Sequence, residues 1–232
     1  MQLDFFDNTQ NSVLTSTHYD RFKSELIASN CTRCELHKGR TQIVVDRGNP
    51  KALIMLIGEG PGENEDKQGK AFVGRAGQLM DELFRGVGID TDRDTLIANV
   101  VKCRPPENRA PRQEEAKTCI AFLKHQISLV KPKIILLLGA TALKHLIPSK
   151  TKFSMNEEAG KFFTVPEFQD TLLMVLYHPA YLLYDARKKV PMREHLERLR
   201  EVLKKNRWFP EPLESIRPQD PTQLSLAGEN AR

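Results

Sequence analysis

Apolar residues occur along the chain in two patterns, short runs that are apolar on both faces and longer stretches with helical spacing. The short runs predict strands, because parallel strands covered by helices are buried on both faces, and the spaced stretches predict helices. The strands expected on this basis are residues 52–57, 96–101, 133–139, 162–165 and 172–177. The helices expected are residues 19–28, 75–87, 112–130, 140–146 and 191–206. Strands that alternate with helices indicate one α/β domain with a mainly parallel sheet.

The composition is that of a single folded unit. The chain has 232 residues, 40% of them hydrophobic and 28% charged, which is enough to build the core of one domain. We place this domain at residues 18–207, between a polar segment, 1–17, and a proline-containing tail, 208–232, both expected to lack regular structure. No apolar run approaches the roughly 18–20 residues of a membrane span, and the start lacks the pattern of a secretion signal. We therefore expect a cytoplasmic protein without a membrane partner.

Charge adds a weak indication of a polyanionic partner. There are 35 Lys and Arg against 30 Asp and Glu, a net charge of +5. The distribution says more than the total, because basic residues gather after two of the predicted strands. These two groups are Lys102, Arg104, Arg109 and Arg112, and Arg187, Lys188, Lys189 and Arg193.

Residues 58–66 have the composition of a binding loop. They contain three glycines, one proline and four carboxylates, and they follow the predicted strand 52–57 directly. Glycines let the backbone approach a ligand closely, and open α/β sheets bind ligands beyond the carboxyl ends of their strands. A solvated acidic loop is the plainer interpretation. A phosphate cradle is disfavoured, because the loop lacks a Gly-Lys-Ser/Thr ending and its carboxylates would repel a phosphate.

Two further polar residues end predicted strands. In a parallel sheet Asn99 and His178 would lie at the same edge as Glu59. An Asn amide offers a donor beside an acceptor and suits the edge of a base, and a His can donate to an oxygen that gains negative charge. Phe72 could stack on a planar ring. The structural alternatives are a turn residue at 99 and a capping or core histidine at 178.

All four cysteines fall into two pairs, which indicates a metal centre. Disulfides are disfavoured in the cytoplasm, whereas thiolate ligands are not. Four unrelated buried thiols, a zinc site and an iron–sulfur cluster are all compatible with the spacing. The ligands would be Cys31, Cys34, Cys103 and Cys119. In each metal case the site would join the chain before the first strand to the loop after the second.

Taken together, four segments resemble the family 4 uracil-DNA glycosylases, the iron–sulfur branch of that superfamily. They are GEGPGE at 58–63, FVGRAG at 72–77, NVVKCRPP at 99–106 and HPAYLL at 178–183. With the cysteine pattern, the resemblance extends over about residues 20–205. It implies a three-layer α/β/α sandwich with a central, mainly parallel four-stranded sheet. It also implies a [4Fe-4S] cluster on the four cysteines, with zinc as the alternative.

The resemblance implies roles for the residues of the pocket and for the protein as a whole. The family releases free uracil from deaminated DNA and leaves an abasic site, so uracil-containing DNA is the expected partner and a monomer the expected state. Glu59 and His178 match catalytic positions. The substrate-binding positions implied are Gly60, Gly62, Glu65, Phe72 and Asn99. Glu65 matches a carboxylate near the C5 edge of the base.

DNA contact is expected at two kinds of residue. An apolar loop would fill the gap left in the base stack by a flipped nucleotide, and basic side chains would hold phosphates. The loop residues are Pro179, Ala180, Tyr181, Leu182 and Leu183, and the basic ones are Arg104, Arg109 and Arg187. The chain departs from the family pattern at Ala71, usually proline, and at Tyr184, often arginine. The rival interpretations are a non-catalytic nucleic-acid-binding module with a four-cysteine metal site and a nucleotide-binding α/β enzyme.

Overall fold

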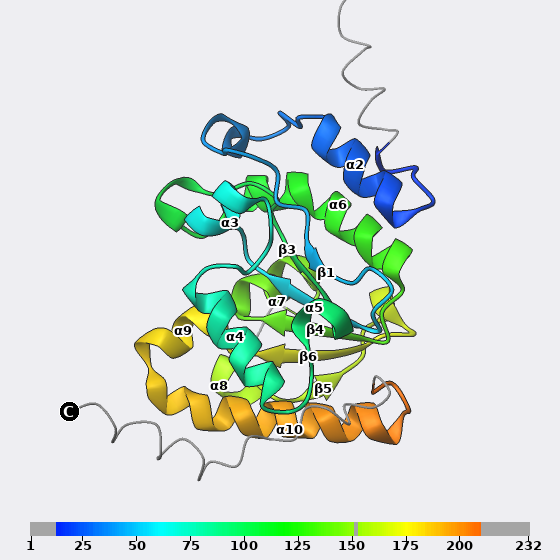
Figure 1. Cartoon of the computed structure of the whole chain (residues 1–232), viewed down its shortest axis with the longest axis vertical. Coiled ribbons are helices and arrows are strands. Elements are labelled where there is room, and N and C mark those ends of the chain that lie inside the picture. The colour runs from blue at the N-terminus through cyan, green and yellow to red at the C-terminus, as the bar shows by residue number, and fades with distance from the viewer. Residues whose placement is uncertain (1–12, 151–152, 210–232) are drawn as a thin grey trace, which may run out of the picture.

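The computed structural model describes residues 13–150 and 153–209, and in these residues six strands form one sheet (Figure 1). Their order across the sheet is β1 (Arg47–Gly48), β3 (Thr95–Asn99), β2 (Ile54–Gly58), β4 (Ile134–Leu138), β6 (Leu172–Leu176) and β5 (Phe162–Phe163). The four inner strands are parallel, and the two-residue edge strands β1 and β5 are antiparallel to their neighbours. The predicted four-stranded parallel sheet is confirmed, with a short strand added at each edge.

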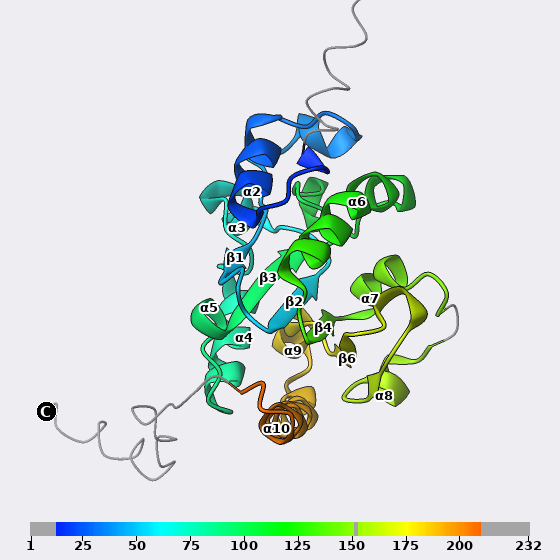
Figure 2. The ribbon, with the colours of Figure 1, turned by 90° about the vertical axis from the view of Figure 1, so that its right-hand side faces the viewer.

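Helices cover both faces of this sheet (Figure 2). One face packs against α2 (Tyr19–Ala28), α6 (Gln113–Val130) and α7 (Ala140–Leu146). The other packs against α4 (Arg75–Arg85), α9 (Pro179–Tyr184) and α10 (Lys189–Lys205). Successive side chains of a strand point to opposite faces, so Met55 and Ile57 enter the first core and Ile54 and Leu56 the second. The expected three-layer α/β/α sandwich is therefore confirmed.

Short elements connect these layers. Further α-helices within the described residues are α3 (Glu63–Gln68), α5 (Thr91–Asp94) and α8 (Met155–Glu158). The 3₁₀ helices are η1 (Glu35–Lys38), η2 (Pro106–Asn108), η3 (Pro166–Phe168) and η4 (Ala186–Lys188). Of the described helices, none is long and apolar enough to cross a bilayer.

The edges of the predicted domain lie partly within the described residues. Val13, in the segment expected to lack regular structure, is fully buried in the core that holds α2. Trp208 and Phe209 pack against the core of α10. The packed unit therefore extends beyond 18–207 at both ends. The predictions for residues 1–12 and 210–232 lie outside the described residues.

All four parallel strands end at one edge of the sheet. The register pairs Gly58 with Asn99 on β2 and β3, and Leu138 with Leu176 on β4 and β6. The residues that follow these strands are consequently neighbours, although more than 100 positions separate Glu59 from His178. This edge carries the candidate site.

Candidate active site

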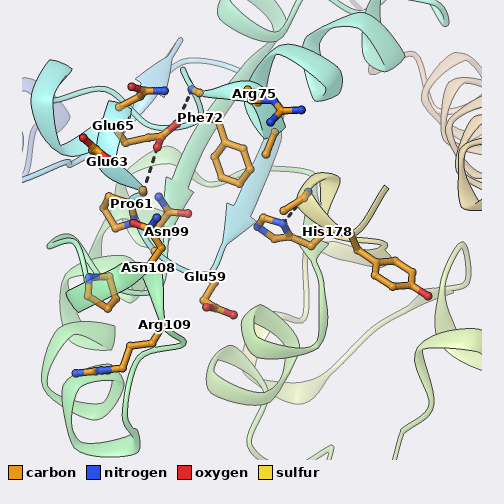
Figure 3. Close-up of a pocket in the computed structure, with 18 of the residues that line it drawn as sticks. Glu59, Pro61, Glu63, Glu65, Phe72, Arg75, Asn99, Asn108, Arg109 and His178 are labelled. Atoms are coloured by element: carbon orange, nitrogen blue, oxygen red, sulfur yellow. Dashed lines mark hydrogen bonds between the residues drawn. The ribbon is translucent and has the colours of Figure 1, made fainter. Parts of the chain in front are cut away.

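A cavity of about 680 Å³ opens at the carboxyl ends of β2, β3 and β6 (Figure 3). Glu59, Asn99 and His178 all line it, as the sequence predicts from their strand-end positions. The other predicted substrate-binding residues on its wall are Gly60, Gly62, Glu65 and Phe72. The volume falls within the range of about 300–1,000 Å³ that is usual for small-molecule sites.

Phe72 and His178 form one wall of the cavity. Their ring centroids are 5.7 Å apart, and the Phe72 side chain is buried beside α4. Gly58 permits this arrangement, because a Cβ there would lie 2.6 Å from the Phe72 ring and 2.5 Å from Oδ1 of Asn99. From the sequence, the glycines of residues 58–66 are expected to let the backbone approach a ligand closely. In the structure, the contribution of Gly58 is the space that it leaves for two neighbouring side chains.

His178 is held as a neutral ring with a defined tautomer. The main-chain N–H of Ala180 donates to Nδ1 of His178 over 3.2 Å, so the proton of the neutral ring resides on Nε2. Burial lowers the pKa of His178, and the nearby negative charge of Glu59 offsets this only in part. The ring therefore offers a neutral N–H donor at pH 7.

The side chain of Asn99 is poised for a ligand. It is only 1% exposed, and neither its oxygen nor its nitrogen has a hydrogen-bond partner among the described residues. A buried amide without partners is costly, so both groups are available to water or to a ligand in the cavity. The main-chain oxygen of Asn99, by contrast, accepts a hydrogen bond of 2.9 Å from Nζ of the buried Lys102. The amide is thus free while its backbone is fixed.

Glu59 and Glu65 differ in what their carboxylates do. The Glu59 carboxylate makes no hydrogen bond to another described residue, and its backbone carbonyl accepts from Val101. The Glu65 carboxylate accepts three main-chain N–H groups, from Gly62 at 3.1 Å, Val73 at 2.8 Å and Gly74 at 2.6 Å. Glu65 therefore joins the loop before α3 to the loop that carries Phe72.

The predicted apolar loop is the short helix α9, and its side chains divide between core and surface. Pro179 and Leu182 are buried, with Leu182 packed in the core beside α4, so neither is on the surface of the free protein. Tyr181 and Leu183 are exposed, and Ala180 and Tyr181 line the mouth of the cavity. The most exposed large apolar side chain there is Tyr184, at 90%.

The three predicted DNA-binding arginines have partners within the protein. Arg104 donates to Asn108, Arg187 pairs with Asp185, and Arg109 makes a bidentate pair with Glu115. Arg109 lines the cavity, and Nη2 of Arg104 lies 3.7 Å from the carboxylate of the cavity-lining Glu63. Arg187 lies in η4, beyond the C-terminal end of α9.

Several cavity-lining residues were not predicted as site residues, and two of them have large side chains suited to contacting a ligand. Arg75 lies on the wall at the start of α4, without an ion pair to another described side chain, and Tyr184 lies at the mouth. The FVGRAG segment and the departure at position 184 were the available signals in the sequence.

The four cysteines lie around one small pocket between α2, η1 and α6. None forms a disulfide, and all four line the pocket. Nη1 of Arg40 donates to Cys103 and the N–H of Lys102 donates to Cys119, each over 3.3 Å. Burial raises the pKa of Cys119 to about 12 and also raises the pKa values of Cys34 and Cys103. Thiols in such a setting become thiolates when a cation binds them.

The same pocket brings together a ligand set for a metal centre. All four cysteine thiols line it, although they come from separate segments of the chain. Four thiolates are ligands that both zinc and iron–sulfur clusters use.

Comparison with known proteins agrees with this fold and site. A family model described as the Uracil DNA glycosylase superfamily matches residues 45–204. The type-4 uracil-DNA glycosylase of Thermotoga maritima is 42% identical over 177 residues, covering 75% of this chain and 90% of that protein. The type-4 enzymes of Sulfurisphaera tokodaii and Saccharolobus solfataricus are 38% and 39% identical, over 84% and 82% of their lengths and 79% and 75% of this chain. The chain belongs to the uracil DNA glycosylase superfamily and, within it, to the type-4 branch.

Proposed function

We propose that the protein excises uracil from DNA by hydrolysing the N-glycosidic bond of a flipped deoxyuridine, leaving an abasic site. The observation that carries this proposal is the convergence of Glu59, Asn99 and His178 on one cavity wall beside Phe72. The names of the relatives support it. A nucleotide must leave the base stack to reach such a pocket, at a cost of a few kcal/mol that is smaller at a mismatch.

The pocket offers a partner to one face of a uracil ring and another to its polar edge. Phe72 would stack on the ring, and the unpartnered amide of Asn99 would supply a donor and an acceptor to its polar edge. Glu65, whose carboxylate is occupied by three main-chain N–H groups, would act by holding the loop of Phe72 in place. Gly60 and Gly62 would keep the pocket wall open to the nucleotide.

Bond cleavage would leave negative charge on the base and positive charge on the sugar. The Nε2–H of neutral His178 would donate to the uracil oxygen that becomes negative. Glu59 would stabilise the sugar cation, position the attacking water, or do both, because its carboxylate lines the cavity with no other hydrogen-bond partner among the described residues. His178 would thus supply the hydrogen bond to the leaving base, and Glu59 would supply the negative charge beside the sugar.

We also propose that Cys31, Cys34, Cys103 and Cys119 hold a [4Fe-4S] cluster that fixes the segment around η1 to α6. Their placement around one pocket supports a shared metal centre, and the resemblance to the type-4 enzymes supports a cluster over zinc. Absorption near roughly 400 nm in the purified protein would indicate iron, and a colourless protein with bound zinc would refute the cluster.

DNA would be held on the face that surrounds the cavity mouth. Tyr181, Leu183 and Tyr184 expose apolar surface there that could fill the gap in the stack. Arg104, Arg109 and Arg187 would contact phosphates while keeping their carboxylate or amide partners. As the sequence predicts, we expect a monomer that works in the cytoplasm.

The decisive experiment measures uracil release from a single-uracil oligonucleotide, detected as strand scission after alkali. His178→Ala is expected to slow release by about 10²–10³-fold, the usual cost of removing such a donor, and Glu59→Gln is expected to slow it strongly as well. His18→Ala and Glu82→Gln, exposed residues outside the cavity, are the matched controls. Binding without base release by the wild type would instead favour a nucleic-acid-binding module.

A further inference from the structure

Phe72 has a backbone conformation that is unfavourable for a residue with a side chain. Its φ is +54°, in the left-handed region that glycine prefers. Residues persist in this region when the surrounding structure holds them there, and they cluster at functional sites. The ring of Phe72 is the wall against which the base of the proposed reaction would stack. The position of this wall therefore depends on the groups that hold the backbone.

The peptide group that follows Phe72 is held at both its oxygen and its nitrogen by other parts of the chain. Its carbonyl oxygen accepts a hydrogen bond from Nη1 of Arg47 and packs closely on α4, where a Cβ at Gly77 would come within 1.9 Å of that oxygen. The N–H of Val73 in the same peptide group, and the next N–H, that of Gly74, donate to the carboxylate of Glu65. Arg47 is the only side chain that bonds to the carbonyl of Phe72 among the described residues.

Arg47 is itself fixed from several directions and lies outside the cavity lining. Its Nη2 donates to Asp81 and to Thr91, the latter over 3.0 Å, and its Nε lies 3.1 Å from Asp92. The side chain is 9% exposed. Because Asp81 lies on α4 and Thr91 on α5, the guanidinium joins the two helices to the carbonyl of Phe72.

We propose that Arg47 is a positioning residue, which holds Phe72 in its left-handed conformation and thereby sets the plane of the stacking ring. This inference rests on the proposed function, because it assigns the residue a part in base binding. Arg47 reaches the site through the backbone of Phe72 and touches neither base nor sugar. Without its hydrogen bond, Phe72 would relax toward a negative φ and its ring would leave the wall of the pocket.

The test is a double-mutant cycle on the full-length, cluster-containing protein, read as single-turnover rates of uracil release. Arg47→Met removes every donor and keeps the length of the side chain. We expect it to slow release by about 10- to 100-fold, as misplacement of a binding group by about 1 Å does. In the Phe72→Ala background the same change is expected to alter the rate by less than about twofold, because coupled residues are not additive.

A matched control and a second variant keep the result interpretable. Arg93→Met removes an arginine that pairs with Asp94 but does not contact Phe72, and it is expected to leave the rate unchanged. If Arg47→Met does not fold, Arg47→Lys decides, because an ammonium retains the charge beside Asp81 without the fork that also reaches the carbonyl of Phe72. Thermal midpoints of all variants separate loss of stability from loss of rate.

The outcomes are distinct. Equal losses from Arg47→Met with and without the Phe72 ring would overturn the positioning role and leave the proposed function intact. A wild-type rate of uracil release in the Arg47 variants would also overturn the positioning role without affecting the proposed function. A wild-type protein that releases no uracil would overturn the proposed function itself.

Discussion

Replacing Gly58 with Ala tests the geometry of the pocket with a single methyl group. The added Cβ would lie 2.5 Å from Oδ1 of Asn99 and 2.6 Å from two carbons of the Phe72 ring, where ordinary contacts begin at 3.4 Å. Both side chains must therefore retreat by roughly 0.8–0.9 Å. Misplacement of binding groups by about 1 Å costs about 10²-fold in rate, and overpacking costs about 1–3 kcal/mol of stability. We expect a folded protein that is slowed about 100-fold.

The assay is single-turnover uracil release, with the thermal midpoint measured on the same preparation. Gly39→Ala is the matched control, because a Cβ at Gly39 would meet no atom within 4 Å. The control is expected to keep the wild-type rate. A Gly58→Ala variant as fast as the control would show that Phe72 and Asn99 do not have to occupy their observed positions, and the proposed base site would be refuted.

Three further predictions address the proton, the cluster and the DNA contact. Because burial keeps the pKa of His178 below its ordinary value of 6.5, the unfolded chain binds that proton first in acid. The free energy of unfolding should thus fall as the pH drops below about 6.5, and denaturant titrations of His178→Asn should show a smaller fall; equal falls would contradict the buried neutral ring. Cys119→Ser should lose the absorption near roughly 400 nm and lower the thermal midpoint, whereas unchanged absorption would remove Cys119 from the ligand set. Arg187→Ala should reduce the salt dependence of DNA affinity by about one phosphate contact. The control Arg85→Ala, at the end of α4 away from the cavity, should leave it unchanged. Equal slopes of log affinity against log salt for the Arg187 variant and the wild type would exclude Arg187 from the interface.

The arrangement of the main elements follows from patterns that are local in sequence. Apolar runs such as residues 133–139 and spaced apolar residues in 112–130 identified the parallel strands and their covering helices, and the structure confirms both. The edge strand β1 was missed and β5 is shorter than expected, because two-residue strands are too short to show a period. Residues 13–17 pack on the domain through two adjacent apolar residues, Val13 and Leu14, which are too few to form a pattern that predicts their burial.

The candidate site was predictable to the extent that strand ends determine it. Glu59, Asn99 and His178 follow parallel strands, so their convergence required only the sheet topology. The left-handed backbone of Phe72 and its hydrogen bond from Arg47 arise from tertiary contacts between distant segments. The arginines near the pocket differ, because their partners lie only a few residues away in the sequence. Sequence shows their charge, but the pairing of Arg109 with Glu115 also requires the conformation of the segment that joins η2 to α6.

The six-residue helix α9 contributes to the candidate site in two ways. Its exposed side chains Tyr181 and Leu183 face the solvent where a strand would seat, and its first free amide, that of Ala180, fixes which nitrogen of His178 bears the proton. His178 is also the N-cap of α9. The tautomer of the ring is therefore set by the backbone of the same short helix that presents Tyr181 and Leu183 to solvent, and it is already set in the free protein.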